Sequence, residues 1–275
     1  MEFLNIGVST VKDGAGGHYT EEELKAVLRV YRGLSVRAIE FSHVFDMTED
    51  SAARIGDTCR RLGMVPWSVH LRGITPDREA SRRTVSHDLL MAHKLGATVC
   101  VLHAIGEPEQ GEKYLENYRE VSEIAAQYGL LVAIETGTLR IGKTTGSDHE
   151  TLIRLVDAID RPNVGVNIDM GHSALCDPTP VADIVRHVGD RLFTLHCQDN
   201  FGQRDDHQAP GIGLTDWRSV LKALKESSYS GPFLMELTDS GKANRAIGTL
   251  GGFVMPIEEE IAGASAWISY LWSTL

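Results

Sequence analysis

Acidic and imidazole side chains recur in this sequence at the ends of short apolar runs. Glu135, Asp169, His196 and Glu236 each close such a run in the second half of the chain. Three carboxylates confined beside one imidazole would force some of the acids to protonate, whereas a divalent cation would neutralise them. Oxygen-rich ligation with one histidine suits Mn²⁺ first, and Zn²⁺, Co²⁺ or Mg²⁺ would also fit. The four residues therefore predict a metal site, the alternative being that each is an ordinary solvated residue at a strand end.

A second set of possible ligands surrounds the first. His70 and His103 end two earlier apolar runs, His172 follows Asp169 in the pattern D-x-x-H, and Asp205 with His207 forms D-x-H. These five residues could complete a cluster of two or three metal ions. They could equally bind the hydroxyls of a substrate or orient the metal ligands through hydrogen bonds. The sequence leaves both roles open.

Two other features carry less functional weight. His87, His93, His149 and His187 fall on predicted helices, where we expect solvated surface side chains.

The run Gly137–Thr144, G-T-L-R-I-G-K-T, matches the pattern of a phosphate-binding loop. Such a loop binds phosphate only when the helix that follows it starts at the lysine. Here a capping box of Ser147 and Glu150 predicts a later helix start. We therefore expect a loop over the pocket, with Arg140 or Lys143 reaching a substrate anion.

Eight strand-like runs, each followed by a helix-like run, must position these residues. The predicted strands are Leu4–Ser9, Ala38–Ser42, Val65–His70, Ala97–His103, Leu130–Glu135, Val164–Asp169, Leu192–His196 and Pro232–Leu237. Between several of them, apolar residues repeat at i, i+3, i+4 and i+7, which is typical of a helix with one buried face. Eight such units predict an α/β protein, a single (β/α)₈ TIM barrel domain over residues 1–275, with an open doubly wound sheet as the second choice.

The barrel also predicts which way each strand-end side chain points. Strand side chains alternate between two faces, so a polar residue pointing into the barrel has apolar neighbours that point to the helices. Asp169 follows Ile168 and Val166, and His70 follows Val69 and Trp67, so these apolar residues should face outward. In six consecutive strands the residue able to do chemistry falls on the inward side.

Composition narrows the class of protein and its partners. The chain has 275 residues, 42% of them hydrophobic and 24% charged, and its net charge of −11 disfavours a nucleic-acid partner. No apolar run approaches the ~18 residues of a membrane span. The start M-E-F-L-N-I-G-V does not resemble a signal peptide, and the four cysteines form no C-x-x-C pair, so we expect a cytoplasmic protein with reduced thiols. The predicted helix Ile257–Leu275 carries Trp267 and Trp272 and could cover the barrel or meet another subunit of a homo-oligomer.

One stretch resembles a known family. The run from His196 to Trp217, H-C-Q-D-N-F-G-Q-R-D-D-H-Q-A-P-G-I-G-L-T-D-W, and the later G-P-F-L-M-E-L resemble the sugar phosphate isomerase/epimerase family of xylose isomerase-like barrels. The resemblance implies that Glu135, Asp169, His196 and Glu236 bind a divalent metal. It also implies that the two glutamates exchange a proton with a carbon next to a carbonyl, and that His172 contacts the substrate.

The nine residues taken together also resemble abasic-site endonucleases of the endonuclease IV type, which bind three zinc ions. Against that function, H-C-Q-D-N replaces the nuclease's H-L-N-D-S, and the early loops offer few basic or aromatic residues to hold a duplex. The run E-T-G-T-L-R-I from Glu135 also departs from the E-x-x-N-R-x-E signature of the 3-epimerase subgroup.

We therefore expect a metal-dependent isomerase or epimerase of a sugar, polyol or keto-sugar, phosphorylated or not, that works through an enediolate. Glu135 and Glu236 would be the acid and base. The alternatives are an endonuclease IV-like phosphodiester hydrolase, a lyase that dehydrates a keto-polyol, and a sugar-binding barrel without turnover.

Overall fold

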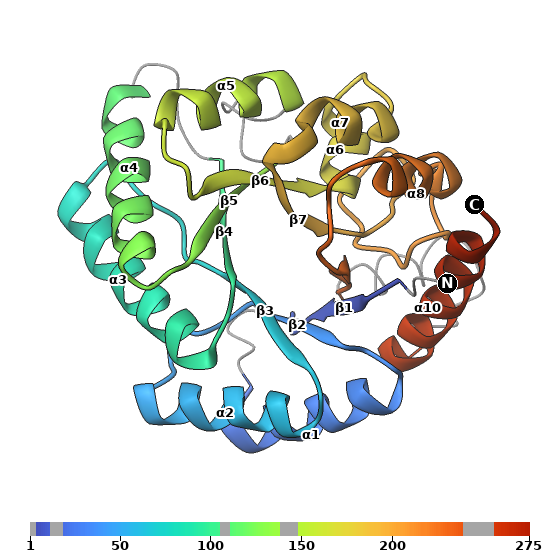
Figure 1. Cartoon of the computed structure of the whole chain (residues 1–275), viewed down its shortest axis with the longest axis horizontal. Helices are drawn as coiled ribbons and strands as arrows, with labels where there is room; N and C mark the ends of the chain where they lie inside the picture. Colours follow the sequence, from blue (N-terminus) through green and yellow to red (C-terminus); the bar gives the residue numbers. More distant parts are fainter. Residues whose placement is uncertain (1–3, 12–18, 105–110, 138–147, 239–255) are drawn as a thin grey trace.

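The computed structural model describes residues 4–11, 19–104, 111–137, 148–238 and 256–275. Eight strands occupy the centre and helices surround them (Figure 1). The strands are β1 (Ile6–Ser9), β2 (Ala38–Phe41), β3 (Val65–His70), β4 (Val99–His103), β5 (Leu131–Glu135), β6 (Val164–Asp169), β7 (Leu192–His196) and β8 (Phe233–Met235). The helices are α1 (Glu21–Gly33), α2 (Glu49–Arg61), α3 (Arg78–Leu95), α4 (Gly111–Gln127), α5 (His149–Ile159), α6 (Met170–Cys176), α7 (Val181–Val188), η3 (Gly189–Arg191), α8 (Trp217–Glu226) and α10 (Ile257–Thr274).

The strands form one parallel sheet that curls into a nearly closed barrel. Their order is β7-β6-β5-β4-β3-β2-β1-β8: each strand from β1 to β6 pairs with the next one along the chain, and β8 pairs with β1. The two ends of the sheet meet through a parallel bridge between Cys197 and Met235, where the Cys197 amide donates to the Leu234 carbonyl at 2.7 Å. The predicted TIM barrel is confirmed, and the sequential strand order is not that of a doubly wound sheet.

Local sequence signals define the helix ends. The Thr20 hydroxyl accepts from the Glu23 amide, and the Glu23 carboxylate accepts from the Thr20 amide, which is the capping box that starts α1. Helix α5 differs from expectation, because its N-cap is Asp148, whose side chain accepts from the Thr151 amide. Its first residue is therefore His149, one position later than a Ser147 cap would give.

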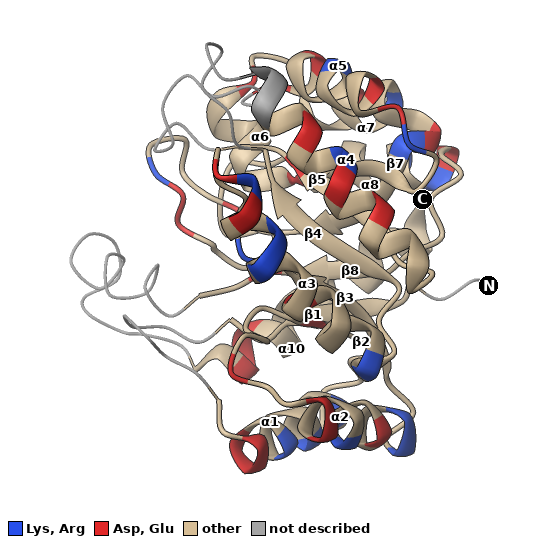
Figure 2. Ribbon diagram, turned by 90° about the vertical axis from the view of Figure 1, so that its left-hand side faces the viewer, with Lys and Arg blue, Asp and Glu red and all other residues tan. Residues whose placement is uncertain are grey.

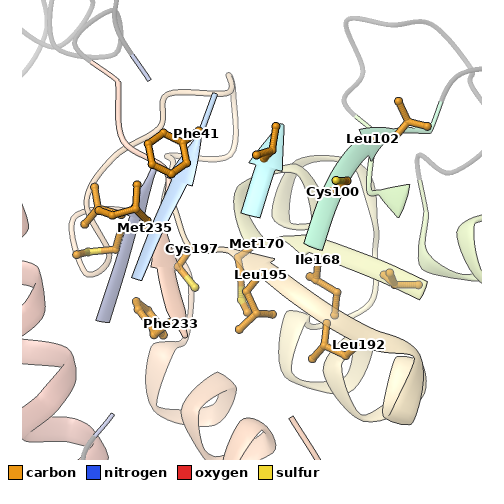
Figure 3. Close-up of a cluster of buried hydrophobic side chains, with 14 of the residues drawn as sticks. Phe41, Cys100, Leu102, Ile168, Met170, Leu192, Leu195, Cys197, Phe233 and Met235 are labelled. Carbon is orange, nitrogen blue, oxygen red and sulfur yellow. The ribbon is translucent and has the colours of Figure 1, made fainter. Parts of the chain in front are cut away.

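The main core lies between the strands and the helices. It contains the outward-facing side chains of neighbouring strands, among them Leu102, Ile168, Leu195 and Phe233, all nearly or fully buried (Figure 3). The alternation predicted from the sequence therefore sends the apolar residues to the helices. The side chains on the opposite face of each strand point into the barrel interior.

Trp67 contradicts the predicted alternation, because it points into the barrel. Its indole Nε1 donates to the Thr194 hydroxyl at 2.9 Å, and Thr194 lies on β7, four strands away. The pairing of β2 with β3 shifts at this point: Ile39 pairs with Pro66, and Glu40 pairs with Ser68. Trp67 is thus the extra residue of a β-bulge, which redirects a side chain that would otherwise face the helices.

The outer surface carries mixed charges, with acidic and basic residues interspersed along α1 and α2 (Figure 2). Helix α10 lies beside α8 and buries Ile261, Ile268 and Leu271, whereas Trp267 is 40% exposed. All four cysteines are free thiols. Among the described residues, no helix combines the length and the apolar character needed to cross a membrane.

Candidate metal centre at the carboxyl ends of the strands

Four buried side chains from adjacent strands converge at one end of the barrel. Glu135, Asp169 and His196 are the last residues of β5, β6 and β7, and Glu236 directly follows β8. One ligand atom from each lies within 4.8 Å of all the others. His196 Nδ1 is 3.0 Å from Glu135 Oε1, 3.2 Å from Glu236 Oε2 and 3.8 Å from Asp169 Oδ2. The structure thus places three carboxylates around one imidazole nitrogen, and we call this set the central group.

A second group shares Glu135 with the first. His70 and His103 end β3 and β4, and His70 Nε2 lies 3.1 Å from Glu135 Oε2 while His103 Nδ1 lies 3.3 Å from the same oxygen. The ligand atoms of these three residues are also within 4.8 Å of one another. Glu135 therefore directs one oxygen to each group and connects them.

A third group also lies beside the central one, and its His172 ring is 6.5 Å from the His103 ring of the second group. His172 Nε2 and His207 Nε2 both lie 3.2 Å from Asp205 Oδ2. His172 is the third residue of α6, and Asp205 and His207 belong to the segment between β7 and α8, which is fixed by paired backbone hydrogen bonds between Asp199 and Gln208. His207 adopts a φ of 46°, a left-handed conformation that costs a non-glycine residue about 1–2 kcal/mol. Its backbone is held in that conformation by the surrounding structure.

The hydrogen bonds of the histidines orient the ring nitrogens toward the carboxylates. Three rings direct Nδ1 at a backbone carbonyl: His70 at Leu71 (3.3 Å), His172 at Thr136 (2.9 Å) and His207 at Glu236 (3.2 Å). A carbonyl only accepts, so Nδ1 must carry the proton. In each neutral ring, Nε2 then has a free lone pair facing the carboxylates, which is the usual arrangement of a metal-binding histidine.

Protons on His70, His172, His196 and His207, but not on His103, balance the buried carboxylates when no cation is bound. Burial lowers the pKa of His70, but its hydrogen bond with Glu135 and the charge of that carboxylate outweigh burial and raise the pKa to about 9. Burial raises the pKa of Glu236, but the charge of His196 and its hydrogen bond lower it to about 2. Asp169 has the opposite net shift: burial dominates and raises its pKa to about 6. Divalent cations bind deprotonated ligands, so a bound ion would replace these protons.

Two buried residues of the site were not identified from the sequence. Glu40 on β2 is fully buried, and its Oε2 lies 3.0 Å from His196 Nε2. The Gln198 amide donates both to Asp169 Oδ1 (3.2 Å) and to Asp205 Oδ1 (2.7 Å), which links the central and third groups. The run A-I-E-F at Ala38–Phe41 already placed Glu40 on the inward side of its strand. For Gln198, the sequence offered only its position two residues after His196.

The expectation that His149 is a solvated surface residue is wrong. The side chain is buried, its Nδ1 donates to Asp177 Oδ2 at 2.6 Å, and its Nε2 lies 3.0 Å from Nδ1 of the exposed His187. Asp177 follows α6, so the partner that buries His149 is distant in sequence. The expectation for Arg140 and Lys143 falls in residues 138–147, outside the part of the chain that the structure describes.

Comparison with known proteins gives one family and several relatives. The family model described as xylose isomerase-like TIM barrel matches residues 29–269. An uncharacterised protein of Methanocaldococcus jannaschii is 27% identical over 180 residues, which are 62% of this chain and 61% of that protein. D-psicose 3-epimerase of Enterocloster bolteae is 28% identical over 174 residues, 58% of this chain and 56% of the enzyme. The chain thus spans about three fifths of the length of these relatives.

Among solved structures, a D-psicose 3-epimerase crystallised in the presence of D-fructose superimposes with a TM-score of 0.81. The match covers 98% of this chain and 99% of that one at 16% sequence identity, which establishes a shared fold.

Proposed function

The chain belongs to the family of xylose isomerase-like TIM barrels, and on that premise we propose that it is a divalent-metal-dependent isomerase or epimerase of a sugar, polyol or keto-sugar. The observation that carries this proposal is the central group, in which Glu135, Asp169, His196 and Glu236 converge at one buried point. Its relatives include a sugar 3-epimerase, which supports the substrate class.

The donor set fits a divalent cation. Three carboxylates and one imidazole suit Mn²⁺, with Zn²⁺, Co²⁺ or Mg²⁺ as alternatives. Asp169 Oδ2 is buried and has no hydrogen-bond partner among the described residues, so this oxygen is available as a ligand. When bound, the cation would polarise a carbonyl and its neighbouring hydroxyl and so lower the energy of the negative charge that develops during proton removal.

Glu135 and Glu236 are the proposed acid and base. Neighbouring imidazoles hold the pKa of Glu135 well below its usual range against the opposing effect of burial, and they lower that of Glu236 to about 2, so both are ionised and able to accept a proton. One carboxylate would remove the proton from the carbon beside the carbonyl, giving an enediolate. Protonation of the same carbon on its opposite face gives the epimer, whereas protonation of the former carbonyl carbon, with the hydroxyl proton passing to the other oxygen, gives the isomer. Because β5 and β8 are separated by two strands, the carboxylates approach the substrate from different directions.

His172 and His207 would hold the substrate in this scheme. Their Nε2 atoms face Asp205 next to the central group, and both rings are partly or fully buried. When these rings are protonated, Nε2 can donate to a hydroxyl of a sugar, and Asp205 can accept a hydrogen bond from a hydroxyl.

Solvent exchange tests the proposal directly. The protein with Mn²⁺ is incubated in D₂O with D-psicose, D-fructose and a panel of other ketoses, and deuterium at the carbon next to the carbonyl is followed by NMR. We expect exchange together with a change of sugar, and both should be lost in Glu236→Gln. Product mass separates isomerisation from dehydration, because a lyase product is lighter by one water. A panel with no exchange on any ketose would contradict the proposal.

Phosphodiester hydrolysis is the second candidate, because three ligand groups lie side by side in the described part of the chain. His70 and His103 with Glu135, and His172 with Asp205 and His207, supply ligands for two further ions, and a multi-ion site suits the cleavage of phosphate esters. A labelled abasic DNA duplex tests this activity. Metal-dependent nicking by the purified protein would favour the hydrolase, and intact duplex under conditions of ketose turnover would favour the isomerase.

A further inference from the structure

Glu40 reaches the metal centre from the far side of the barrel. It lies on β2, whereas its partner His196 lies on β7, and β1 and β8 separate these strands in the sheet. The carboxylate is fully buried, and Oε2 is 3.0 Å from His196 Nε2. The Ser68 hydroxyl on β3 donates to the same oxygen at 2.8 Å. Residues from β2, β3 and β7 thus hold the Glu40 carboxylate against the imidazole ring of His196 in the central group.

Stability does not account for a carboxylate at this place. Glu40 Oε1 is buried without a hydrogen-bond partner among the described residues. Burying a charge with one oxygen unsatisfied costs free energy, and apolar residues of similar volume often replace a buried ion pair without loss. An unsatisfied buried group in the interior therefore points to a role at the site.

The geometry around His196 shows what that role is. Nδ1 faces the carboxylates of the central group, and Nε2 faces Glu40 alone. Carboxylate oxygens only accept hydrogen bonds, so Nε2 carries a proton and donates a hydrogen bond to Glu40. Nδ1 also faces carboxylates, so a cation in the central group would displace the Nδ1 proton and bind its lone pair, while Nε2 stays protonated. A carboxylate behind a ligating histidine also makes the ring a stronger donor.

We propose that Glu40 is a positioning residue that fixes the orientation and tautomer of His196, so that Nδ1 serves as the metal ligand. This inference rests on the proposed metal-dependent function and adds to it a residue that contacts neither metal nor substrate. It assigns to β2 a part in the centre, which otherwise draws its ligands from β3 to β8 and the segments that follow them.

Two variants separate this role from a structural one. Glu40→Gln keeps the side-chain volume and one oxygen acceptor but removes the charge and permits the opposite ring orientation. Ser68→Ala is the matched control, because it removes the other hydrogen bond to the same oxygen without touching His196. Mn²⁺ affinity is measured by titration of the metal-free protein, without substrate. We expect a 10–100-fold loss of affinity at the tightest site for Glu40→Gln and less than a 3-fold change for Ser68→Ala.

Nitrogen-15 NMR of the histidine rings gives a readout that needs no variant at Glu40. In the Zn²⁺-loaded protein, with His196→Asn used for assignment, His196 should carry its proton on Nε2 and coordinate through Nδ1. Coordination through Nε2, or equal Mn²⁺ affinities of folded Glu40→Gln and the unsubstituted protein, would overturn the inference. Neither readout depends on turnover, so an inactive protein with the expected affinities and tautomer would reject the proposed reaction alone.

Discussion

Replacing Asp169 by asparagine should stabilise the metal-free protein, although the residue lies at the centre of the site. Asp169 Oδ1 accepts from the His172 amide at 2.8 Å, which caps α6, and from the Gln198 amide. Oδ2 has no hydrogen-bond partner in the described part of the chain. Burial and the neighbouring charges of Glu135 and Asp205 raise the pKa of Asp169 from 3.8 to about 6, against the opposing effect of His172. Asparagine keeps the capping oxygen and removes the charge.

The size of the effect follows from that pKa. When folding raises the pKa of an acid, the free energy of unfolding falls as the pH rises from the unfolded pKa to the folded pKa. Above the folded pKa the group is ionised in both states, and the full loss of stability remains. A rise from 3.8 to about 6 corresponds to about 3 kcal/mol, so ionised Asp169 lowers the free energy of unfolding by that amount at pH 7.5. Asp169→Asn should recover it and raise Tm by roughly 5–10 °C. The difference should shrink below pH 6 and vanish near pH 3.8.

Calorimetry in chelator at pH 7.5 and pH 5 measures this difference, and Asp199→Asn is the matched control. Asp199 is equally buried, but its carboxylate accepts from the amides of Asn200, Gly211 and Thr215 and from the Trp217 indole. An amide there leaves a donor unsatisfied and should lower the free energy of unfolding by about 1–3 kcal/mol. Added Mn²⁺ should stabilise the unsubstituted protein more than Asp169→Asn. If Asp169→Asn destabilises the metal-free protein as the control does, ionised Asp169 does not destabilise the empty site, and the proposal that its charge serves to bind a cation is refuted.

Four further changes test other parts of the account. Glu236→Gln should keep the fold but lower ketose turnover by about 10²–10⁴-fold, and near-normal turnover would remove its acid–base role. Free Mn²⁺ at 100 times its Kd should add about 2.7 kcal/mol to the free energy of unfolding, and an unchanged Tm with and without chelator would count against binding. In Gly171→Ala, the added methyl would overlap the Gln198 amide, so Mn²⁺ affinity should fall, whereas Gly263→Ala, with no atom within 4 Å, should bind normally. Thr20→Ala removes the cap of α1 and should cost about 1 kcal/mol in denaturant unfolding, with equal stability as the contrary result.

The fold and the central group were predictable because both depend on short-range sequence patterns. The alternation of apolar and polar residues predicted all eight strands. It also predicted that Ile168 points to the helices and Asp169 into the barrel. Parallel strands that alternate with helices follow one another around a barrel, so consecutive strand ends must meet at one rim. The position of Glu135 beside Asp169 and His196 therefore followed from strand order alone, although the roles of these residues stay predictions.

The remaining features depend on contacts between distant segments. Trp67 entered the barrel because of a one-residue bulge, which a pattern of alternating residues does not reveal. Glu40 stood on the correct face, but its importance comes from His196 across the barrel, 156 positions later. His149 is buried with its ring hydrogen-bonded to Asp177, and nothing near His149 in the sequence indicates that partner.

Anomalous diffraction from crystals grown with Mn²⁺ would locate the bound ion. We expect a strong peak enclosed by Glu135, Asp169, His196 and Glu236, within coordination distance of His196 Nδ1, and its loss in Asp169→Asn crystals. Additional peaks beside His70 or His207 would mark ions in the second and third groups. A saturated crystal with no peak among the four central side chains would show that the central group does not bind the metal.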